Sequence, residues 1–309
     1  MPVGITRLGE RLALWRDADG VVHALEDRCP HRGARLSLGW NLGNRLACWY
    51  HGVEIGTDGK VVAVPAVGDC PLAQRGAVKT YSVEEHQGAI FVYFPVADEP
   101  TPPLELPTQL VAEEFSSFLC TAHWKCNYRY AVDNVMDPMH GAYLHAQSHS
   151  MAEGARNAEM ATRKTETGFI FEKTGQSGIN FDWVEWGETT GLWMRLEIPY
   201  RPAAGPGGVF GIIGFATPVD ADNTMVFFWR VRRVSGWQRN VWRFLYRTRL
   251  EALHWQVLEQ DRLVLESMAS DAREQEFLVP HDAGLGRVRL FLERKVREQL
   301  KARRRIEDH

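Results

Sequence analysis

The 309-residue sequence lacks the features of several protein classes. No apolar run approaches the roughly 18 residues that a membrane-spanning helix needs. The N-terminus, MPVGITRLGERLALW, has no basic segment followed by an apolar one, as a signal peptide would have. The formal net charge is only −3, far from the strong excess of one sign that binds nucleic acid or anionic lipid. We therefore expect a cytoplasmic protein with no nucleic-acid partner and no membrane partner.

Cysteine is scarce, and the five that occur are Cys29, Cys48, Cys70, Cys120 and Cys126. An odd, widely spaced set in a long chain without a secretion signal is unlike the paired framework of a disulfide-rich protein. We expect reduced thiols, some of which bind a metal.

The pattern along the chain predicts two domains. Residues 1–100 contain short β-branched and aromatic runs separated by turn sequences such as Asp17-Ala18-Asp19-Gly20, which predicts a small all-β domain. Five prolines among residues 95–107 indicate an extended connection, because proline donates no backbone hydrogen bond. Residues 108–309 combine a helical stretch near 130–146, several strand-like runs and a long helical pattern from about 236. This order predicts an α+β fold in which an antiparallel sheet wraps on a long C-terminal helix.

The most specific motif lies in residues 29–51, CPHRGARLSLGWNLGNRLACWYH. Cys29-x-His31 precedes Cys48-x-x-His51, so each of two loops offers one thiolate and one imidazole. This set suits a zinc ion with two Cys and two His ligands, or a [2Fe–2S] cluster with Cys on one iron and His on the other. Zinc fingers usually pair like ligands within one loop and place their histidines on a helix, which these loops do not.

A second group of ligand residues lies in residues 133–145, DNVMDPMHGAYLH. An iron that binds O₂ needs few protein ligands, and two His with one carboxylate are the usual set. His140 and His145 are five residues apart, about 140° on an ideal helix, so both reach one metal only if the helix loosens, as a π-bulge allows. His145 and His149, four residues apart, suit an ideal helix better.

A carboxylate for such a site is available on the C-terminal helical pattern. Asp261 falls on an apolar stripe that includes His254, Leu258 and Leu265, whereas Glu259 and Glu266 fall outside it. A buried Asp is costly unless it is paired or bound to a metal. A buried salt bridge to an arginine is the alternative interpretation of Asp261.

Taken together, these motifs resemble the large (α) subunit of Rieske non-haem iron ring-hydroxylating oxygenases. The cluster motif extends to the flanking Pro30, Arg32, Gly33 and Gly52, and neither loop has the extra cysteine of bc-complex Rieske proteins. Asp137-x-x-His140-x₄-His145, preceded by Asn134, is similar to the mononuclear-iron motif, and Glu-Gln-Asp-Arg around Asp261 is similar to its late carboxylate. The resemblance runs from Gly9 to about Arg289. Family members usually have a few dozen residues before RLALWRD, so this chain is expected to be shortened or to start late.

The resemblance implies specific roles for the motif residues. Cys29, His31, Cys48 and His51 would hold the [2Fe–2S] cluster, and His140, His145 and Asp261 the mononuclear Fe(II). Asp137 would link the two centres between neighbouring subunits of a homotrimer; the alternative is a charge at a helix N-terminus next to Pro138. The remaining cysteines, Cys70, Cys120 and Cys126, would be small buried hydrophobes.

The function that the resemblance implies is O₂-dependent hydroxylation of an aromatic or related cyclic substrate. Electrons would come from NAD(P)H through a separate reductase, with or without a ferredoxin. Oxidative O- or N-demethylation is the runner-up reaction, and a Rieske electron carrier is less favoured, since residues 108–309 would then have no purpose. A few aromatic side chains of the second domain should line a substrate pocket. The basic tail from Arg287 is expected to form a solvated amphipathic helix, with docking of an acidic electron-transfer partner as the second interpretation.

Overall fold

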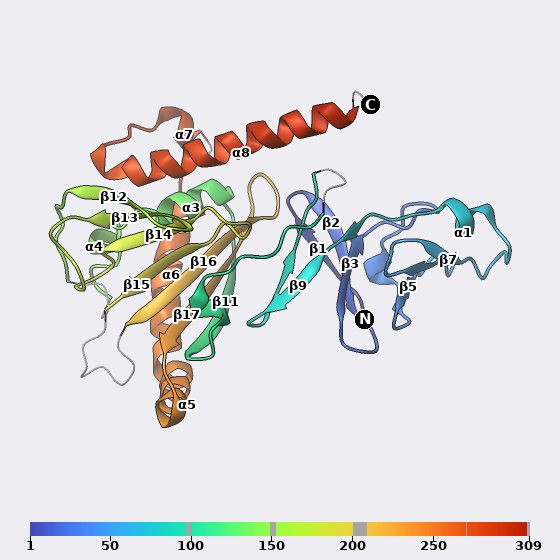
Figure 1. Cartoon of the computed structure of the whole chain (residues 1–309), viewed down its shortest axis with the longest axis horizontal. Helices are drawn as coiled ribbons and strands as arrows, with labels where there is room; N and C mark the ends of the chain where they lie inside the picture. The colour runs from blue at the N-terminus through green and yellow to red at the C-terminus, as the bar shows by residue number, and fades with distance from the viewer. Residues whose placement is uncertain (97–99, 149–152, 200–208, 270, 308–309) are drawn as a thin grey trace. The chain divides into compact units, whose positions relative to one another are not determined.

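The structure is a computed structural model that describes residues 1–96, 100–148, 153–199, 209–269 and 271–307 (Figure 1). The chain divides into two compact units, Met1–Pro102 and the residues from Pro103 onward. Among the described residues, no helix is long and apolar enough to cross a membrane.

The first unit is built almost entirely of short antiparallel strands. One sheet has the order β1-β2-β3-β8 and consists of Val3–Arg7, Glu10–Arg16, Val22–Glu26 and Thr80–Tyr81. A second has the order β4-β5-β6-β7 and consists of Trp40–Asn41, Arg45–Ala47, Glu54–Gly56 and Val61–Ala63. A hairpin of β9 (Val83–His86) and β10 (Ala89–Val92), the 3₁₀ turn η1 (Leu36–Leu38) and the short helix α1 (Pro71–Arg75) complete the unit. The predicted small all-β domain is confirmed.

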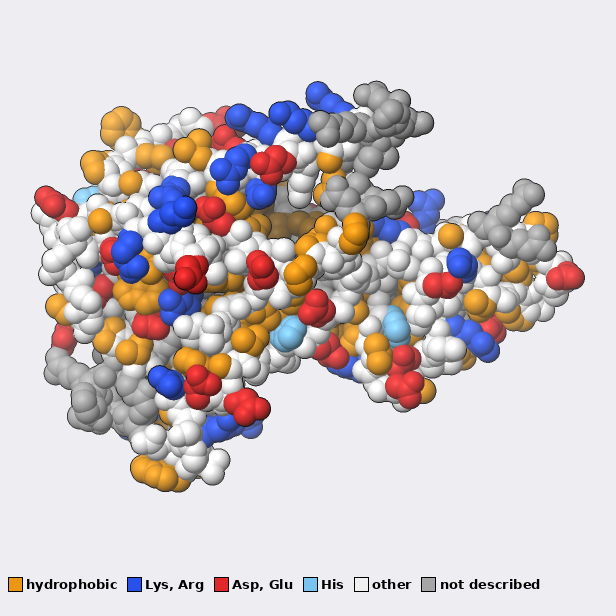
Figure 2. Space-filling view, in the orientation of Figure 1, with side chains coloured by type: hydrophobic (Ala, Val, Ile, Leu, Met, Phe, Trp, Pro, Cys, Tyr) orange, Lys and Arg blue, Asp and Glu red, His pale blue; other side chains and the backbone are white. Residues whose placement is uncertain are grey.

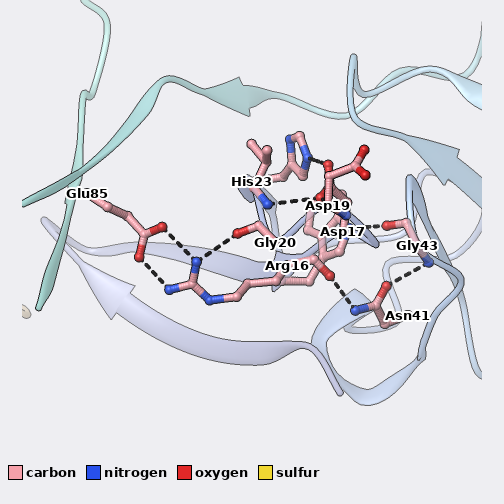
Figure 3. Close-up of polar contacts among 10 residues, drawn as sticks. Arg16, Asp17, Asp19, Gly20, His23, Asn41, Gly43 and Glu85 are labelled. Carbon is pink, nitrogen blue, oxygen red and sulfur yellow. Dashed lines mark hydrogen bonds and ion pairs between the residues drawn. The ribbon is translucent and has the colours of Figure 1, made fainter.

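Side-chain hydrogen bonds hold the β2–β3 hairpin against its neighbours (Figure 3). The Arg16 guanidinium forms an ion pair with Glu85 of β9 and donates to Oε2 at 2.6 Å. Asp17 lies 2.8 Å from His23 Nε2, and this contact lowers the pKa of the Asp17 carboxyl. Asn41 of β4 donates to the Arg16 carbonyl oxygen at 2.7 Å. The hairpin is therefore tied to two other strands of the unit.

The second unit contains a seven-stranded antiparallel sheet of order β11-β17-β16-β15-β14-β13-β12. Its strands in chain order are Phe115–Trp124, Met160–Lys164, Gly168–Lys173, Trp183–Gly187, Met194–Ile198, Phe210–Pro218 and Thr224–Arg233. Alternate residues of β15 face the core, because Met194, Leu196 and Ile198 are buried whereas Arg195 and Glu197 between them are half-buried. The core is rich in aromatic side chains, including Trp124, Trp186, Trp242, Phe169 and Phe171.

Helices pack on this sheet and position the ligand residues. Figure 1 shows α6 (Glu251–Glu266) behind β16 and β17, and α3 (Tyr128–Val135) contacts the same strands and α6. The helical pattern predicted from 236 consists of α5 (Gly236–Leu245), one π-helical segment η3 (Tyr246–Leu250) and α6, which follow one another without a gap. The short helices α2 (Thr108–Val111), α4 (Gly141–Leu144), α7 (Ala272–Gln275) and η4 (Pro280–Asp282) lie between longer elements. The predicted α+β fold is confirmed.

The C-terminal helix α8 (Ala283–Glu307) is amphipathic in the predicted way. Its buried face includes Leu285, Val288 and Phe291, and Phe291 packs edge-on against Trp186 of β14. Basic side chains such as Arg294 and Arg297 are exposed, and Figure 2 shows Lys and Arg side chains gathered along this helix. Docking of a partner on this surface stays a prediction.

Candidate metal centres

Two loops of the first unit present the predicted cluster ligands with the same backbone turn. Cys29 follows β3, and its carbonyl oxygen accepts a hydrogen bond from Gly33 N at 2.9 Å. Cys48 follows β5, and its carbonyl oxygen accepts from Gly52 N at 2.9 Å. Both glycines adopt the left-handed backbone conformation, with φ of 77° and 69°, which residues other than glycine rarely adopt. The loops therefore curl each Cys and His toward a shared space.

The four side chains in these loops form a buried thiol pair and a more accessible imidazole pair. Burial, reinforced by the adjacent Cys48 thiol, raises the pKa of Cys29 to about 11. The rings of His31 and His51 lie 4.8 Å apart and edge to face, and His31 is exposed. The negative charges of two neighbouring thiolates repel each other, and a bound iron would stabilise both of them.

The spacing of these four residues fits a binuclear cluster better than a single zinc ion. Ligands at the usual 2.0–2.3 Å from one zinc lie within about 4 Å of one another. Among the described residues, one group of at least three His, Cys, Asp or Glu side chains has all of its donor atoms within 4.8 Å of one another. That group is His140, His145 and Asp261. The cluster residues instead form separate Cys and His pairs, as a [2Fe–2S] group requires.

The second unit brings the other three predicted ligands together around a break between two helices. The prediction of one loosened helix through 130–146 is wrong, because α3 ends at Val135 and α4 begins only at Gly141. Pro138 lacks a backbone N–H and disfavours a helical residue before it, which explains the break. His140 and His145 are the residues flanking the single turn of α4. His149 lies outside the described residues, as does His309.

Asp261 of α6 completes this group and is 8% exposed. Its Oδ1 lies 3.5 Å from His140 Nε2 and 3.2 Å from His145 Nε2. Within the described residues this buried oxygen has no well-aligned hydrogen-bond donor. Ligands held at right angles, about 2.1 Å from one metal, lie roughly 3 Å apart. Within the described ranges no arginine forms an ion pair with Asp261, and the donor set fits Fe(II).

Burial and charge act differently on the two histidines. Burial lowers the pKa of His140, although the Asp261 and Asp137 carboxylates oppose this effect. Burial also acts downward on His145, but contact with Asp261 outweighs it and raises the pKa of that imidazole. Neutral imidazole is the form that binds a metal.

Hydrogen bonds on the far side of each ring orient both histidines. His145 Nδ1 donates to Gln260 Oε1 at 2.8 Å, and His140 Nδ1 donates to the Asp137 carbonyl oxygen at 2.5 Å. Both bonds leave the Nε2 lone pairs directed at Asp261. The Asp137 side chain is 29% exposed and accepts from Met139 N at 2.8 Å; its Oδ2 lies 4.0 Å from His140 Nδ1. A carboxylate at the surface therefore adjoins the backbone that holds His140.

A pocket opens beside His140, His145 and Asp261. Most of its wall is apolar: Phe181, Leu196, Ile198, Phe210, Ile212 and Phe228. A mainly apolar wall with a few polar groups is typical of a site for a small organic ligand. Among the aromatic side chains of this domain, Phe181, Phe210 and Phe228 line the pocket, whereas Trp186, Trp193 and Trp229 are buried elsewhere.

Sequence reasoning missed several residues of this site. Gln260 directly precedes Asp261 in the Glu-Gln-Asp-Arg motif. This position could have indicated that its side chain lies next to the metal ligands. Phe181, just before β14, and Arg230 of β17 line the pocket, and no local pattern marks either; His254 was placed on the apolar stripe of Asp261 but was given no role. Cys120 and Cys126 are buried as predicted, and Cys70 is half-buried.

Comparisons with known proteins match each unit of the chain to a family model. Residues 1–82 match the family model of the Rieske [2Fe-2S] domain, and residues 124–298 match that of the vanillate O-demethylase oxygenase C-terminal domain. A vanillate O-demethylase oxygenase subunit from a Pseudomonas species is 38% identical over 151 residues, 48% of this chain and 41% of that protein. The oxygenase component of dicamba O-demethylase from Stenotrophomonas maltophilia is 36% identical over 146 residues, 47% of this chain and 42% of that protein.

Solved structures share the fold over nearly the whole chain. The structure of Pseudomonas putida CBB5 NdmA with caffeine superposes with a TM-score of 0.75 at 22% identity, and covers 94% of this chain and 83% of that one. Dicamba monooxygenase bound to dicamba gives 0.72 at 24% identity, covering 97% and 93%. The sequence matches to the two O-demethylase components span less than half of those relatives' length.

Proposed function

Since the chain belongs to the Rieske oxygenases with a vanillate O-demethylase type of catalytic domain, we propose that it is the terminal oxygenase component of a multicomponent system. The system would hydroxylate a small aromatic or related cyclic compound with O₂ and NAD(P)H. The observation that carries this proposal is the convergence of His140 Nε2, His145 Nε2 and Asp261 Oδ1 at the wall of an apolar pocket.

We assign the metal ligands on the geometry of the two sites. Cys29 and Cys48 would hold one cluster iron and His31 and His51 the other. His140, His145 and Asp261 would hold the mononuclear iron. Once bound, the cluster supplies single electrons and the mononuclear iron supplies O₂ activation.

The surrounding residues prepare the site for this chemistry. Gln260 and the Asp137 carbonyl fix both imidazoles with Nε2 toward the metal position. His140, His145 and Asp261 would hold the iron with only three protein ligands, and the apolar side chains of Phe181 and Phe228 in the adjoining pocket wall would help to exclude water.

Oxidative demethylation is the second candidate reaction, and the matched C-terminal family model favours it. One oxygen atom of O₂ would enter a methyl C–H bond of a methoxy or N-methyl group, and the other would leave as water. Two electrons and two protons come from NAD(P)H and solvent. The hydroxymethyl product then releases formaldehyde and leaves the phenol or amine.

The partners follow from the need for electrons. We propose a separate NAD(P)H-dependent reductase, acting directly or through a ferredoxin, and a homotrimer in which Asp137 adjoins the cluster of a neighbouring subunit. A cytoplasmic location suits a system that draws on NAD(P)H.

Metal analysis tests the proposal. The purified chain should contain about three irons and about two acid-labile sulfides at full occupancy. Asp261→Ala should lose the mononuclear iron and keep the cluster, whereas Glu259→Ala, an exposed neighbour on the same helix, should lose neither. A native protein with zinc alone, or three irons retained in Asp261→Ala, would contradict the assignment.

Product analysis separates the two reactions. With a reductase and methoxy-substituted arenes, demethylation releases formaldehyde in a one-to-one ratio with the phenol, and ring hydroxylation releases none. O₂ uptake that matches neither product would indicate an uncoupled reaction.

A further inference from the structure

The two cluster loops are joined by a side-chain contact that metal binding does not explain. Arg32 follows His31 in the first loop, and Tyr50 precedes His51 in the second. The guanidinium carbon of Arg32 lies 5.5 Å from the centre of the Tyr50 ring, and its Nη1 lies 3.5 Å from the Tyr50 hydroxyl oxygen. A cation at this distance from an aromatic ring is attracted by the negative face of the ring. The contact therefore connects one loop with the other.

Tyr50 also contacts one of the four proposed cluster ligands. The centroid of its ring lies 3.8 Å from that of His51, with 32° between the two ring planes. His51 is half-buried, whereas Tyr50 is 58% exposed and Arg32 is exposed as well. The Tyr50 ring thus holds the charge of Arg32 beside the imidazole side of the cluster position.

The positive charge of Arg32 is not neutralised within the described part of the chain. Residues 28–52 contain several arginines and no Asp or Glu. The carboxylates on either side of this range, Asp27 and Glu54, are bonded to other side chains. Among the described residues no carboxylate forms an ion pair with Arg32, whose contacts are those with Tyr50. A net positive charge therefore remains at the end of the unit that presents the cluster ligands.

Such a charge affects how readily a cluster accepts an electron. Reduction adds one negative charge to a [2Fe–2S] group, and a fixed cation nearby attracts that charge. The attraction is stronger at a protein surface than in bulk water, because the effective dielectric constant is lower. The potentials of iron–sulfur clusters depend on net charge and on the groups around the ligands. Removing the cation should therefore make reduction harder.

We propose that Arg32 raises the reduction potential of the cluster and that Tyr50 holds Arg32 in the place where it does so. Both are positioning residues, because neither would bind iron. A higher potential favours transfer of an electron from the reductase to the cluster. The inference rests on the cluster of the matched Rieske domain and not on the oxygenase reaction.

A redox titration of the purified, cluster-loaded chain tests the inference without turnover. The visible spectrum of the cluster gives the ratio of reduced to oxidised protein at a fixed solution potential, at pH 7 and low salt. Arg32→Gln should lower this ratio about threefold to tenfold, which is about 30–60 mV for a one-electron couple. Arg32→Lys keeps the charge and should lower the ratio by a smaller factor.

Variants of Tyr50 separate the charge from the ring that holds it. Tyr50→Phe keeps the aromatic face and should leave the potential unchanged. Tyr50→Leu still covers His51 but no longer attracts the guanidinium, so it should lower the potential by less than Arg32→Gln does. The double variant should have the same potential as Arg32→Gln alone, because Tyr50 acts only through Arg32.

A matched control is available in the same loop. Arg35 is also exposed and is not one of the cations that lie over Tyr50, so Arg35→Gln removes the same charge without the contact. It should shift the potential by less than half as much as Arg32→Gln. Iron and acid-labile sulfide contents show that each variant is loaded. If Tyr50→Leu does not retain the cluster, the comparison of the two Arg32 variants with Arg35→Gln decides the question.

The outcomes distinguish this inference from the proposed function. An unchanged potential in Arg32→Gln, or an equal shift in Arg35→Gln, would overturn the role of Arg32. Additive shifts in the double variant would overturn the assignment of Tyr50 as the residue that holds it. Either result leaves the oxygenase proposal intact, since no substrate is present. Conversely, the expected shifts in a chain that consumes no O₂ would support this inference and contradict the proposed function.

Discussion

Single side chains outside the proposed ligand set determine how the histidine ligands of the iron site are oriented. Gln260 is the best example, because its Oε1 accepts from His145 Nδ1 and so fixes which ring nitrogen carries the proton. Without this acceptor the imidazole can rotate or change tautomer, and Nε2 is no longer held toward Asp261.

Gln260→Leu should therefore weaken iron binding about 10- to 100-fold while the cluster spectrum stays unchanged. Competition with a chelator of known affinity measures the effect. Gln256→Leu, an exposed position one turn earlier on α6, provides the control. Equal iron retention in both variants would show that Gln260 does not orient His145.

Lys173 of β13 is a second residue with a large expected effect. It is 3% exposed, and within the described residues its Nζ has no hydrogen-bond partner. Burial lowers its pKa below the ordinary 10.5, although the Asp182 and Asp137 carboxylates act in the opposite direction. The charged form therefore destabilises the folded state.

Lys173→Met should raise the free energy of unfolding at neutral pH by about 1–4 kcal/mol. Above the lowered folded-state pKa the wild-type lysine is neutral in the folded chain but still protonated in the unfolded one. The stability of the wild type therefore rises with pH toward 10.5, and its deficit relative to the variant shrinks. Urea titrations at pH 7 and 9.5 measure this difference. Lys164→Met, exposed on β12, should show neither effect.

At the scale of elements, the two cluster loops depend on glycine at one position each. A Cβ at Gly52 would meet only Pro65 Cγ, at 3.9 Å, so space is not the constraint. The constraint is its φ of 69°, which brings the Gly52 N–H to the Cys48 carbonyl oxygen.

Gly52→Ala should destabilise the first unit by about 1–2 kcal/mol, the usual cost of a left-handed conformation for an L-residue. The measurement is loss of cluster absorbance with rising urea concentration. Gly286→Ala on α8 is the matched control, because it has open space and no positive φ, and it should be neutral or slightly stabilising. Equal midpoints for the two variants would contradict a strained loop.

In the second unit, the break between α3 and α4 brings the two histidine ligands together. A continuous helix would separate His140 and His145 by about 140° around its axis. Ending α3 at Val135 and restarting at Gly141 instead places the two rings 5.1 Å apart, centroid to centroid. Pro138 is thus a determinant of the site through its effect on the backbone.

At the scale of the whole molecule, the proposed homotrimer would place Asp137 on the path of electrons between neighbouring subunits. Its backbone holds His140, whereas its partly exposed carboxylate remains available to a neighbouring subunit. Asp137→Asn keeps an oxygen to accept from Met139 N but removes the negative charge.

We expect this variant to retain all of its iron, to have a reducible cluster and to transfer electrons at least about tenfold more slowly in a single turnover. Rapid-mixing measurements of cluster reoxidation in the presence of substrate and O₂ report this rate. Glu259→Gln, an exposed carboxylate on α6, should transfer electrons normally. A normal rate in Asp137→Asn would remove Asp137 from the electron path.

Much of this protein was predictable from local sequence. The cluster motif is confined to residues 29–51. It could be predicted because only a few residue types bind iron, and two short loops bring them together at a fixed spacing. The α+β order followed from the change of hydrophobic period along the chain, because sheets and helices bury their faces with different repeats.

Only the tertiary structure decided which distant residues meet. The apolar stripe had already indicated Asp261, but only the fold brings one of its oxygens within 3.5 Å of two imidazoles. It also placed Arg230 of a strand and His254 of a helix in one pocket wall, and it broke the helix expected around His140. Such contacts depend on the packing of elements far apart in sequence, whereas a motif records only what neighbouring residues do.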